Sequence, residues 1–176
     1  MLQGEALNFF TVQAIGFIGF AIFTASFQLL KPRHTILTQS FANLLIGVHF
    51  LGLGHPMPTF IAFAATFRDL GAALIPQDQW LRILLWAYLA AIYSAAFFLA
   101  HSWIDVCAII GSTIATIAQF FRSHFYVYRL CLLGHNVLWI AVNAAMLSIP
   151  GLIFMSGIML SNLIGIARFI KAQKHS

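Results

Sequence analysis

Residues 7–30 read LNFFTVQAIGFIGFAIFTASFQLL and are followed by Lys31-Pro32-Arg33-His34. The apolar stretch is long enough to cross a bilayer, which takes about 20 predominantly apolar residues. Two bases around a proline end it, because proline breaks the helical hydrogen-bond ladder and charge is costly in hydrocarbon. The stretch is longer than a signal-peptide core, so we interpret it as a retained transmembrane helix.

The same alternation of apolar run and polar break recurs along the whole chain. Short breaks that contain charge, proline or glycine separate the runs. The predicted spans are residues 7–30, 35–54, 57–75, 80–100, 103–121, 125–146 and 149–170. The sequence therefore predicts an all-α integral membrane protein with seven transmembrane helices.

Composition agrees with a membrane protein. Of 176 residues, 61% are apolar and 7% are charged, whereas soluble domains have about 45 to 50% apolar and about 25% charged residues. Seven spans would use roughly 140 residues, so we expect one membrane domain over 1–176 with the lipid bilayer as its partner. The net charge of +5 does not indicate nucleic-acid binding, because the bases separate hydrophobic runs and form no patch.

The nine basic residues all fall toward one predicted side of the membrane. They are Lys31, Arg33, Arg68, Arg82, Arg122, Arg129, Arg168, Lys171 and Lys174. The other side carries Glu5, His55, His101 and Asp105 but no Lys or Arg. Because Lys and Arg are retained in the cytoplasm during insertion, the amino terminus is expected outside and the tail at 171–176 inside.

A weak internal repeat accompanies this topology. Gln28-Leu29-Leu30-Lys31 ends the first span and Gln119-Phe120-Phe121-Arg122 ends the fifth, while Arg68 and Arg168 lie near the inner ends of the third and seventh. We therefore expect two parallel three-helix bundles, 7–75 and 103–170, joined by a linker helix at 80–100. In transporters with parallel repeats, the substrate site lies near the midplane between the halves.

Polar residues within the spans are the candidate site. Asn136, Trp139 and Asn143 fall at i, i+3 and i+7 of the sixth span and share one face. Two amides and an indole could bind a small polar ligand; alternatively, the asparagines hydrogen-bond neighbouring helices. Asn43, His49 and Asn162 join the candidate pocket, with the same packing alternative for each.

Arg68 and Arg168 are candidate contacts to anions or lipid phosphates. Long basic side chains near a helix end usually reach toward the headgroups, while a pair of them could bind an anionic ligand bidentately. Asp69 is adjacent to Arg68 on the helix and is expected to point elsewhere. His101 and Asp105 straddle a break between spans, so we expect no metal site and no cofactor.

A series of short motifs occurs in a fixed order along most of the chain: Ile46-Gly47-Val48-His49-Phe50 with Gly54 and Pro56, Arg68, Ile110-Gly111 with Arg122, Trp139 with Asn143, and Ser148-Ile149 through Asn162 to Arg168-Phe169. In order and spacing this series resembles the YgjV family of bacterial inner membrane proteins. The resemblance implies a multi-pass protein of the bacterial inner membrane, related to the PQ-loop and SWEET-like seven-helix proteins. The sequence departs from the PQ-loop pattern, because Phe27 precedes Gln28 and Ala118 precedes Gln119 where that pattern has proline.

These features favour a SWEET-like facilitator of a small polar solute. No nucleotide-binding motif is present, and the four acidic residues all fall toward helix ends, so passive transport is preferred over ion coupling. The missing prolines favour the alternative, a receptor or assembly partner that keeps the bundle without gating. The sequence has no HExxH motif, no serine elbow and no paired intramembrane carboxylates, so we expect no enzyme. A homo-oligomer is compatible with this reading.

Overall fold

The regular structure is α-helical throughout the residues that the computed structural model describes, 8–75, 78–121 and 124–173. The helices are α1 (Phe9–Ser26), α2 (Pro32–Gly52), α3 (Pro56–Leu74), α4 (Asp78–Leu99), α5 (Trp103–Phe120), α6 (Phe125–Ala145) and α7 (Ile149–Gln173). Their ends lie within four residues of the predicted spans. The largest difference is at α1, which ends at Ser26 and not at residue 30. There, the backbone N–H groups of residues 27–29 bond to carbonyls three residues earlier and close the helix.

Local sequence explains where several helices begin. The Asn8 side chain accepts a hydrogen bond from the backbone N–H of Phe10 at the start of α1. Helices α2 and α3 begin with Pro32 and Pro56, and a proline in the first turn loses no intrahelical bond. These signals depend only on neighbouring residues, which is why the sequence placed the helices well.

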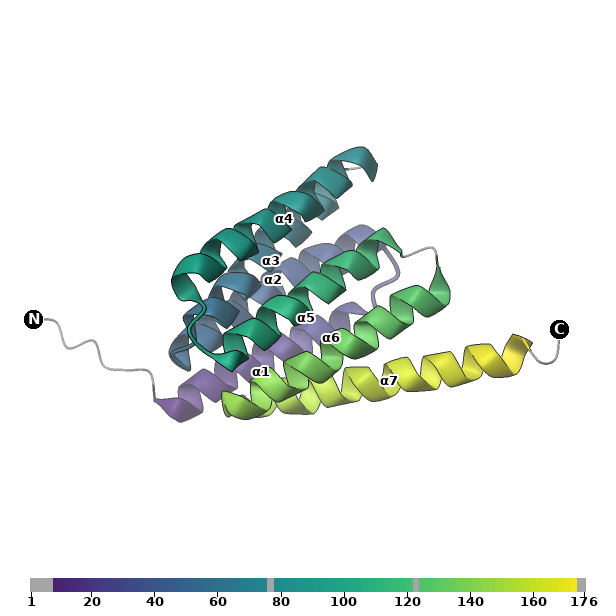
Figure 1. The fold of residues 1–176 in the computed structure, drawn as a ribbon. Coiled ribbons are helices and arrows are strands. Elements are labelled where there is room, and N and C mark those ends of the chain that lie inside the picture. The colour runs from purple at the N-terminus through teal and green to yellow at the C-terminus, as the bar shows by residue number, and fades with distance from the viewer. Residues whose placement is uncertain (1–7, 76–77, 122–123, 174–176) are drawn as a thin grey trace, which may run out of the picture.

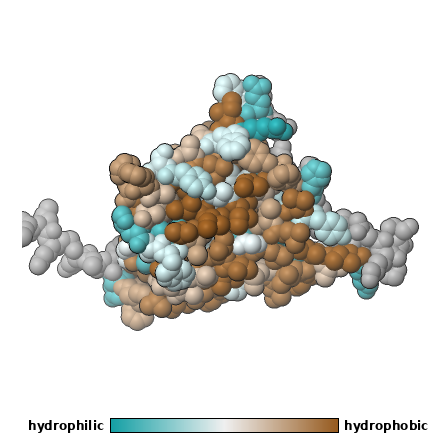
Figure 2. Space-filling model, in the orientation of Figure 1, coloured by the Kyte–Doolittle hydropathy of each residue, from teal (hydrophilic) through white to brown (hydrophobic). Residues whose placement is uncertain are grey.

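Five of the seven described helices are long and apolar enough to cross a membrane: α1, α2, α4, α5 and α7. Helices α3 and α6, with 19 and 21 residues, are not among them. Each carries charged or amide side chains, which lower mean hydropathy. Figure 2 shows hydrophobic residues over much of one face of the molecule, as expected where lipid tails replace water.

The helices pack in an order that follows the chain. Helix α2 packs between α1 and α3, and α6 packs between α5 and α7. Contacts of α3 with α5 and of α1 with α7 join these two groups, and α4 packs against α3 and α5 at the edge of the bundle (Figure 1). The start of α1 and the end of α7 lie at opposite ends of the bundle (Figure 1).

Two turns, α2–α3 and α6–α7, have the same backbone geometry. Gly54 in the first has φ 78° and Leu147 in the second has φ 56°, and their residue numbers differ by 93. In each turn the N–H after this residue bonds back to a carbonyl five residues earlier: His55 to Phe50 and Ser148 to Asn143. Both are Schellman motifs, which usually place glycine at the left-handed position.

We expect opposite effects of substitution at these two left-handed positions. Gly54→Ala should lower stability by about 1 kcal/mol, because an L side chain is strained there. Leu147→Gly should leave the melting temperature unchanged or raise it, since Leu147 is 68% exposed and loses little packing. The measurement is thermal unfolding of purified protein in detergent.

Leu163→Gly is the matched control, because Leu163 is also exposed but lies within α7. It should lower stability by about 1 kcal/mol, the usual cost of glycine within a helix. Equal losses for Leu147→Gly and Leu163→Gly would contradict the strain assigned to Leu147.

Candidate functional site

All six residues of the predicted pocket are buried. Their exposed fractions are 9% for Asn43, 0% for His49, 2% for Asn136, 5% for Trp139, 0% for Asn143 and 3% for Asn162. Polar groups buried in a membrane bundle need partners inside the protein. In the structure, the six residues do not form one pocket but contact different sets of partners. The partners of each residue determine which role it can have.

His49 on α2 is hydrogen-bonded to the first helix and to the turn before the last helix. Its Nδ1 lies 2.8 Å from the Val12 carbonyl of α1, and its Nε2 lies 2.8 Å from the Ser148 hydroxyl before α7. A carbonyl only accepts, so Nδ1 carries the proton, and in the neutral ring Nε2 accepts from Ser148. These two hydrogen bonds agree with the alternative in which His49 holds neighbouring helices together and does not bind a ligand.

Gln13 on α1 reinforces the same junction. Its Nε2 donates to the Leu147 carbonyl at 2.9 Å, and its Oε1 accepts from the Ile149 N–H at 3.1 Å. The side chain thus satisfies two backbone groups of the turn that leads into α7. Sequence reasoning missed Gln13 and Ser148. A glutamine within an otherwise apolar run was the available signal for Gln13.

Asn136, Trp139 and Asn143 form a row along α6, here called the α6 row. Each has a buried polar atom without a hydrogen-bond partner in the part of the chain that the structure describes: Asn136 Nδ2, Trp139 Nε1 and Asn143 Oδ1. The other amide atom of Asn143, Nδ2, donates to the Trp139 carbonyl at 2.7 Å. Two donors and one acceptor of these three side chains therefore have no hydrogen-bond partner among the described residues. Leaving a buried polar group without a hydrogen bond costs folding free energy.

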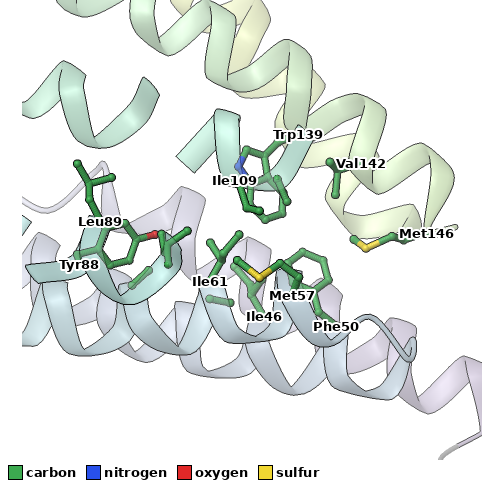
Figure 3. Close-up of a cluster of buried hydrophobic side chains, with 14 of the residues drawn as sticks. Ile46, Phe50, Met57, Ile61, Tyr88, Leu89, Ile109, Trp139, Val142 and Met146 are labelled. Carbon is green, nitrogen blue, oxygen red and sulfur yellow. The ribbon is translucent and has the colours of Figure 1, made fainter. Parts of the chain in front are cut away.

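The indole of Trp139 lies in the core of the bundle. It stacks on Phe50 of α2 with ring centroids 5.7 Å apart and planes at 17°, and Figure 3 draws it among the buried apolar side chains of α2, α3 and α6. Gly111 on α5 permits this position, because a Cβ there would lie 3.0 Å from the indole. The α6 row therefore borders the contact between the two helix groups.

The buried side chains of Asn43 and Asp69 form a polar cluster with the half-buried Arg68. The Asn43 Nδ2 donates to Asp69 Oδ2 at 2.8 Å, and Asp69 Oδ1 lies 2.8 Å from Arg68 Nε and 2.7 Å from Nη2. The Arg68 guanidinium also lies 4.7 Å from the centre of the Tyr88 ring. The expectation that Asp69 would not pair with Arg68 was wrong, because the long arginine side chain folds back on its neighbour.

Asp69 and Asp105 lie toward the ends of α3 and α5, as expected, and both are buried there. Asp69 is 8% exposed and Asp105 is 6% exposed. Asp105 accepts hydrogen bonds from the backbone N–H groups of His101 and Ser102 and forms a capping box for α5. This structural role accounts for the His101 and Asp105 pattern. No three His, Cys, Asp or Glu side chains gather into a metal site within the described ranges.

Asn162 on α7 pairs with Arg129 on α6. The Arg129 Nη1 donates to Asn162 Oδ1 at 2.8 Å, and Asn162 Nδ2 donates to the Arg129 carbonyl at 3.1 Å. The sequence used Arg129 only as an orientation signal and missed this contact. The side chain of Arg168 lies outside the described residues, so its pairing with Arg68 stays a prediction.

Two surface cavities lie away from the α6 row. One of about 450 Å³ is lined by Arg129, Gly157, Leu160, Ser161, Ile164 and Gly165. The other, of about 310 Å³, is lined by Phe60, Phe63, Ala64, Phe67, Arg68, Leu84, Tyr88 and Ala91. Neither is lined by any of the six predicted pocket residues. The structure thus brings the α6 row together but does not open these two cavities onto it.

An apolar surface, buried polar contacts between helices and membrane-length helices define an integral membrane protein. The family model of the Imp-YgjV bacterial inner membrane proteins matches residues 10–173. The chain therefore belongs to this family and is a protein of the bacterial inner membrane. No curated protein and no solved structure matches it.

Breaking the pair of Arg68 and Asp69 should destabilise the fold. Asp69→Asn leaves the Arg68 charge without its carboxylate and should cost about 3 kcal/mol, the usual cost of breaking a buried ion pair. Asn43→Ala removes one neutral donor and should cost about 1 kcal/mol. Thermal unfolding in detergent measures both changes.

The double variant Arg68→Gln with Asp69→Asn serves as the control. It removes both charges and should recover most of the stability that Asp69→Asn loses. A double variant no more stable than Asp69→Asn would show that the pair is not what holds Asp69 in place.

Proposed function

We propose that this protein is a passive carrier of a small uncharged polar solute, built from seven transmembrane helices with the amino terminus outside. The observation that carries the proposal is the α6 row, in which three buried polar atoms lack partners. A ligand with hydroxyl or amide groups would supply both the acceptors and the donor that they need. The row itself contains no ionisable side chain, which favours an uncharged solute.

Seven spans are supported by where the two more polar helices lie. Helix α3 packs against α2, α4 and α5, and α6 packs between α5 and α7. Asp69 on α3 and Arg129 on α6 are hydrogen-bonded to side chains of neighbouring helices. Such internal pairing is what allows a polar helix to cross a bilayer.

The orientation follows from charge. Lys31 immediately precedes α2 and Arg33 lies in its first turn, Arg129 lies near the start of α6, and Lys171 lies near the end of α7. In an alternating bundle these positions share one end, opposite the start of α1 (Figure 1). The positive-inside rule makes that end cytoplasmic.

A repeat of three plus one plus three helices is supported by the packing. Exchanging α1 with α5, α2 with α6 and α3 with α7 preserves the order of packing, because the contact of α3 with α5 then corresponds to that of α7 with α1. The two Schellman turns agree with this exchange at a shift of 93 residues. Helix α4 is the linker in this arrangement.

Close helix crossings follow the same register to within one residue. A Cβ at Gly19 would meet Leu45 and Ile46, and a Cβ at Gly111 would meet Leu138 and Trp139. The register pairs Asn43 with Asn136 and Asp69 with Asn162. It does not pair Gln28 with Gln119; Gln28 lies in the turn after α1 whereas Gln119 lies within α5.

The α6 row has the location that parallel-repeat transporters give to their substrates, between the halves. Phe154, Phe20, Phe50 and Trp139 form a continuous series of ring contacts there, which closes the centre. Solute entry would require the halves to separate, breaking bonds such as that of His49 with Ser148. The described conformation is then a closed state of the carrier.

Passive transport remains preferred despite the buried carboxylate of Asp69. Its two oxygens are bound by Arg68 and Asn43. A carboxylate whose two oxygens are already bound by a guanidinium and an amide offers no open ligand to a coupling ion. We also propose that the protein is related to the PQ-loop and SWEET-like proteins and that it is not an enzyme.

The alternative is a non-transporting receptor or assembly partner. The filled aromatic centre favours it, as does the absence of proline at Phe27 and Ala118. In that case the open atoms of the α6 row would bond buried water, which commonly satisfies such groups.

Trp139→Phe separates the two functions, because phenylalanine keeps the stacking on Phe50 and removes only the indole N–H. For a carrier, loss of one hydrogen bond to the solute should raise KM about ten-fold. Stability without solute should be unchanged or higher, since an open donor has been removed. The measurement is uptake of labelled sugars, nucleosides, vitamins and amino acids by liposomes.

Asn136→Ala should reduce the same flux, and Ser94→Ala on the exposed face of α4 should not. Circular dichroism and size exclusion verify that each variant is folded. If the wild-type protein moves no member of the panel, or Trp139→Phe and Ser94→Ala transport equally, the carrier proposal is refuted.

A further inference from the structure

The α6–α7 groove is the cavity of about 450 Å³ lined by Arg129, Gly157, Leu160, Ser161, Ile164 and Gly165. It is separate from the α6 row, which does not line it. Helix α6 contributes the cationic side chain of Arg129, and α7 contributes small and aliphatic residues. The groove therefore has a charged end and an apolar length.

The guanidinium of Arg129 is held in place at the charged end. Its Nη1 donates to Asn162 Oδ1 at 2.8 Å. A Cβ on Gly165 would lie 3.6 Å from Arg129 Cζ, so the guanidinium packs over the bare backbone of α7. The exposed hydroxyl of Ser161 is a second polar group on the same wall.

The apolar part of the groove faces outward. Leu160 is 58% exposed and Ile164 is 44% exposed, and nothing lies within 4 Å of a Cβ built on Gly157. Arg129 is the fifth residue of α6, about 6 Å from the helix start at 1.5 Å per residue. A guanidinium at that depth lies near the headgroups, and the groove runs from it toward the hydrocarbon.

We propose that the α6–α7 groove binds an anionic phospholipid of the cytoplasmic leaflet. The Arg129 guanidinium bonds a phosphate oxygen, and an acyl chain lies along Gly157 and Leu160. Guanidinium groups bind phosphates through paired hydrogen bonds, and anionic lipids are attracted to basic residues at this surface. The leaflet follows from the orientation proposed above; the binding itself does not depend on transport.

A second copy of this chain fits the groove less well. A second copy would have to bring an anion to the charged end of the groove, and the chain has only four acidic residues. Of these, Asp69 is bound to Arg68 and Asp105 caps α5. A lipid supplies both the phosphate and the apolar chain that the groove can accommodate.

The test is native mass spectrometry of the full chain in detergent, titrated with phosphatidylglycerol, phosphatidylcholine or inorganic phosphate. We expect phosphatidylglycerol to bind at least about ten-fold more tightly than phosphatidylcholine, because only the former carries net charge. Inorganic phosphate should neither bind at millimolar concentration nor displace the lipid. Arg129→Gln should weaken phosphatidylglycerol binding about ten-fold.

Two further variants keep the result interpretable. Arg82→Gln removes an exposed charge on α4 and should leave binding unchanged. Gly157→Leu keeps Arg129 and fills space that is open in the structure, so the protein should fold while lipid affinity falls.

Equal effects of Arg129→Gln and Arg82→Gln would mean non-specific charge attraction and overturn the proposal. Tight binding of inorganic phosphate alone would overturn the proposal that the bound phosphate belongs to a lipid. A wild-type dimer that Gly157→Leu dissociates would replace the lipid with a second copy of the chain.

Discussion

The hydrogen bonds of Gln13 and His49 to the turn before α7 are the interactions on which the rest of the bundle depends. They connect α1 and α2 with the last helix and so close the molecule. In hydrocarbon, no water competes for these groups, and each must be satisfied within the protein. Hydrophobic burial cannot fix the arrangement, because lipid is as apolar as the side chains it would replace.

Polar side chains therefore serve two purposes in this membrane protein. Asn43 with Asp69, and Arg129 with Asn162, bond neighbouring helices and leave few atoms open. The α6 row differs, because its open atoms lie among buried apolar side chains. A buried polar residue that is hydrogen-bonded to other residues has a role in helix packing. A buried polar residue without such partners needs a water molecule or a ligand to satisfy it.

Sequence reasoning succeeded where the signal is local and failed where it depends on side-chain reach. Apolar runs and their polar breaks placed all seven helices, because a span is defined by its own hydropathy. The burial of Asn136, Trp139 and Asn143 on one face followed from helical periodicity. The pairing of Arg68 with Asp69 did not, because it depends on how a flexible arginine folds back.

The sequence by itself determined a helical membrane protein, its family and the approximate helix boundaries. Tertiary structure decided which polar residues are partnered. Gln13 bonds a carbonyl 134 residues away, and His49 bonds a hydroxyl 99 residues away. The periodicity of the sequence does not predict such pairs, because hydropathy describes how each residue interacts with solvent and not which distant residue it contacts. Which groups meet is set by how whole helices pack.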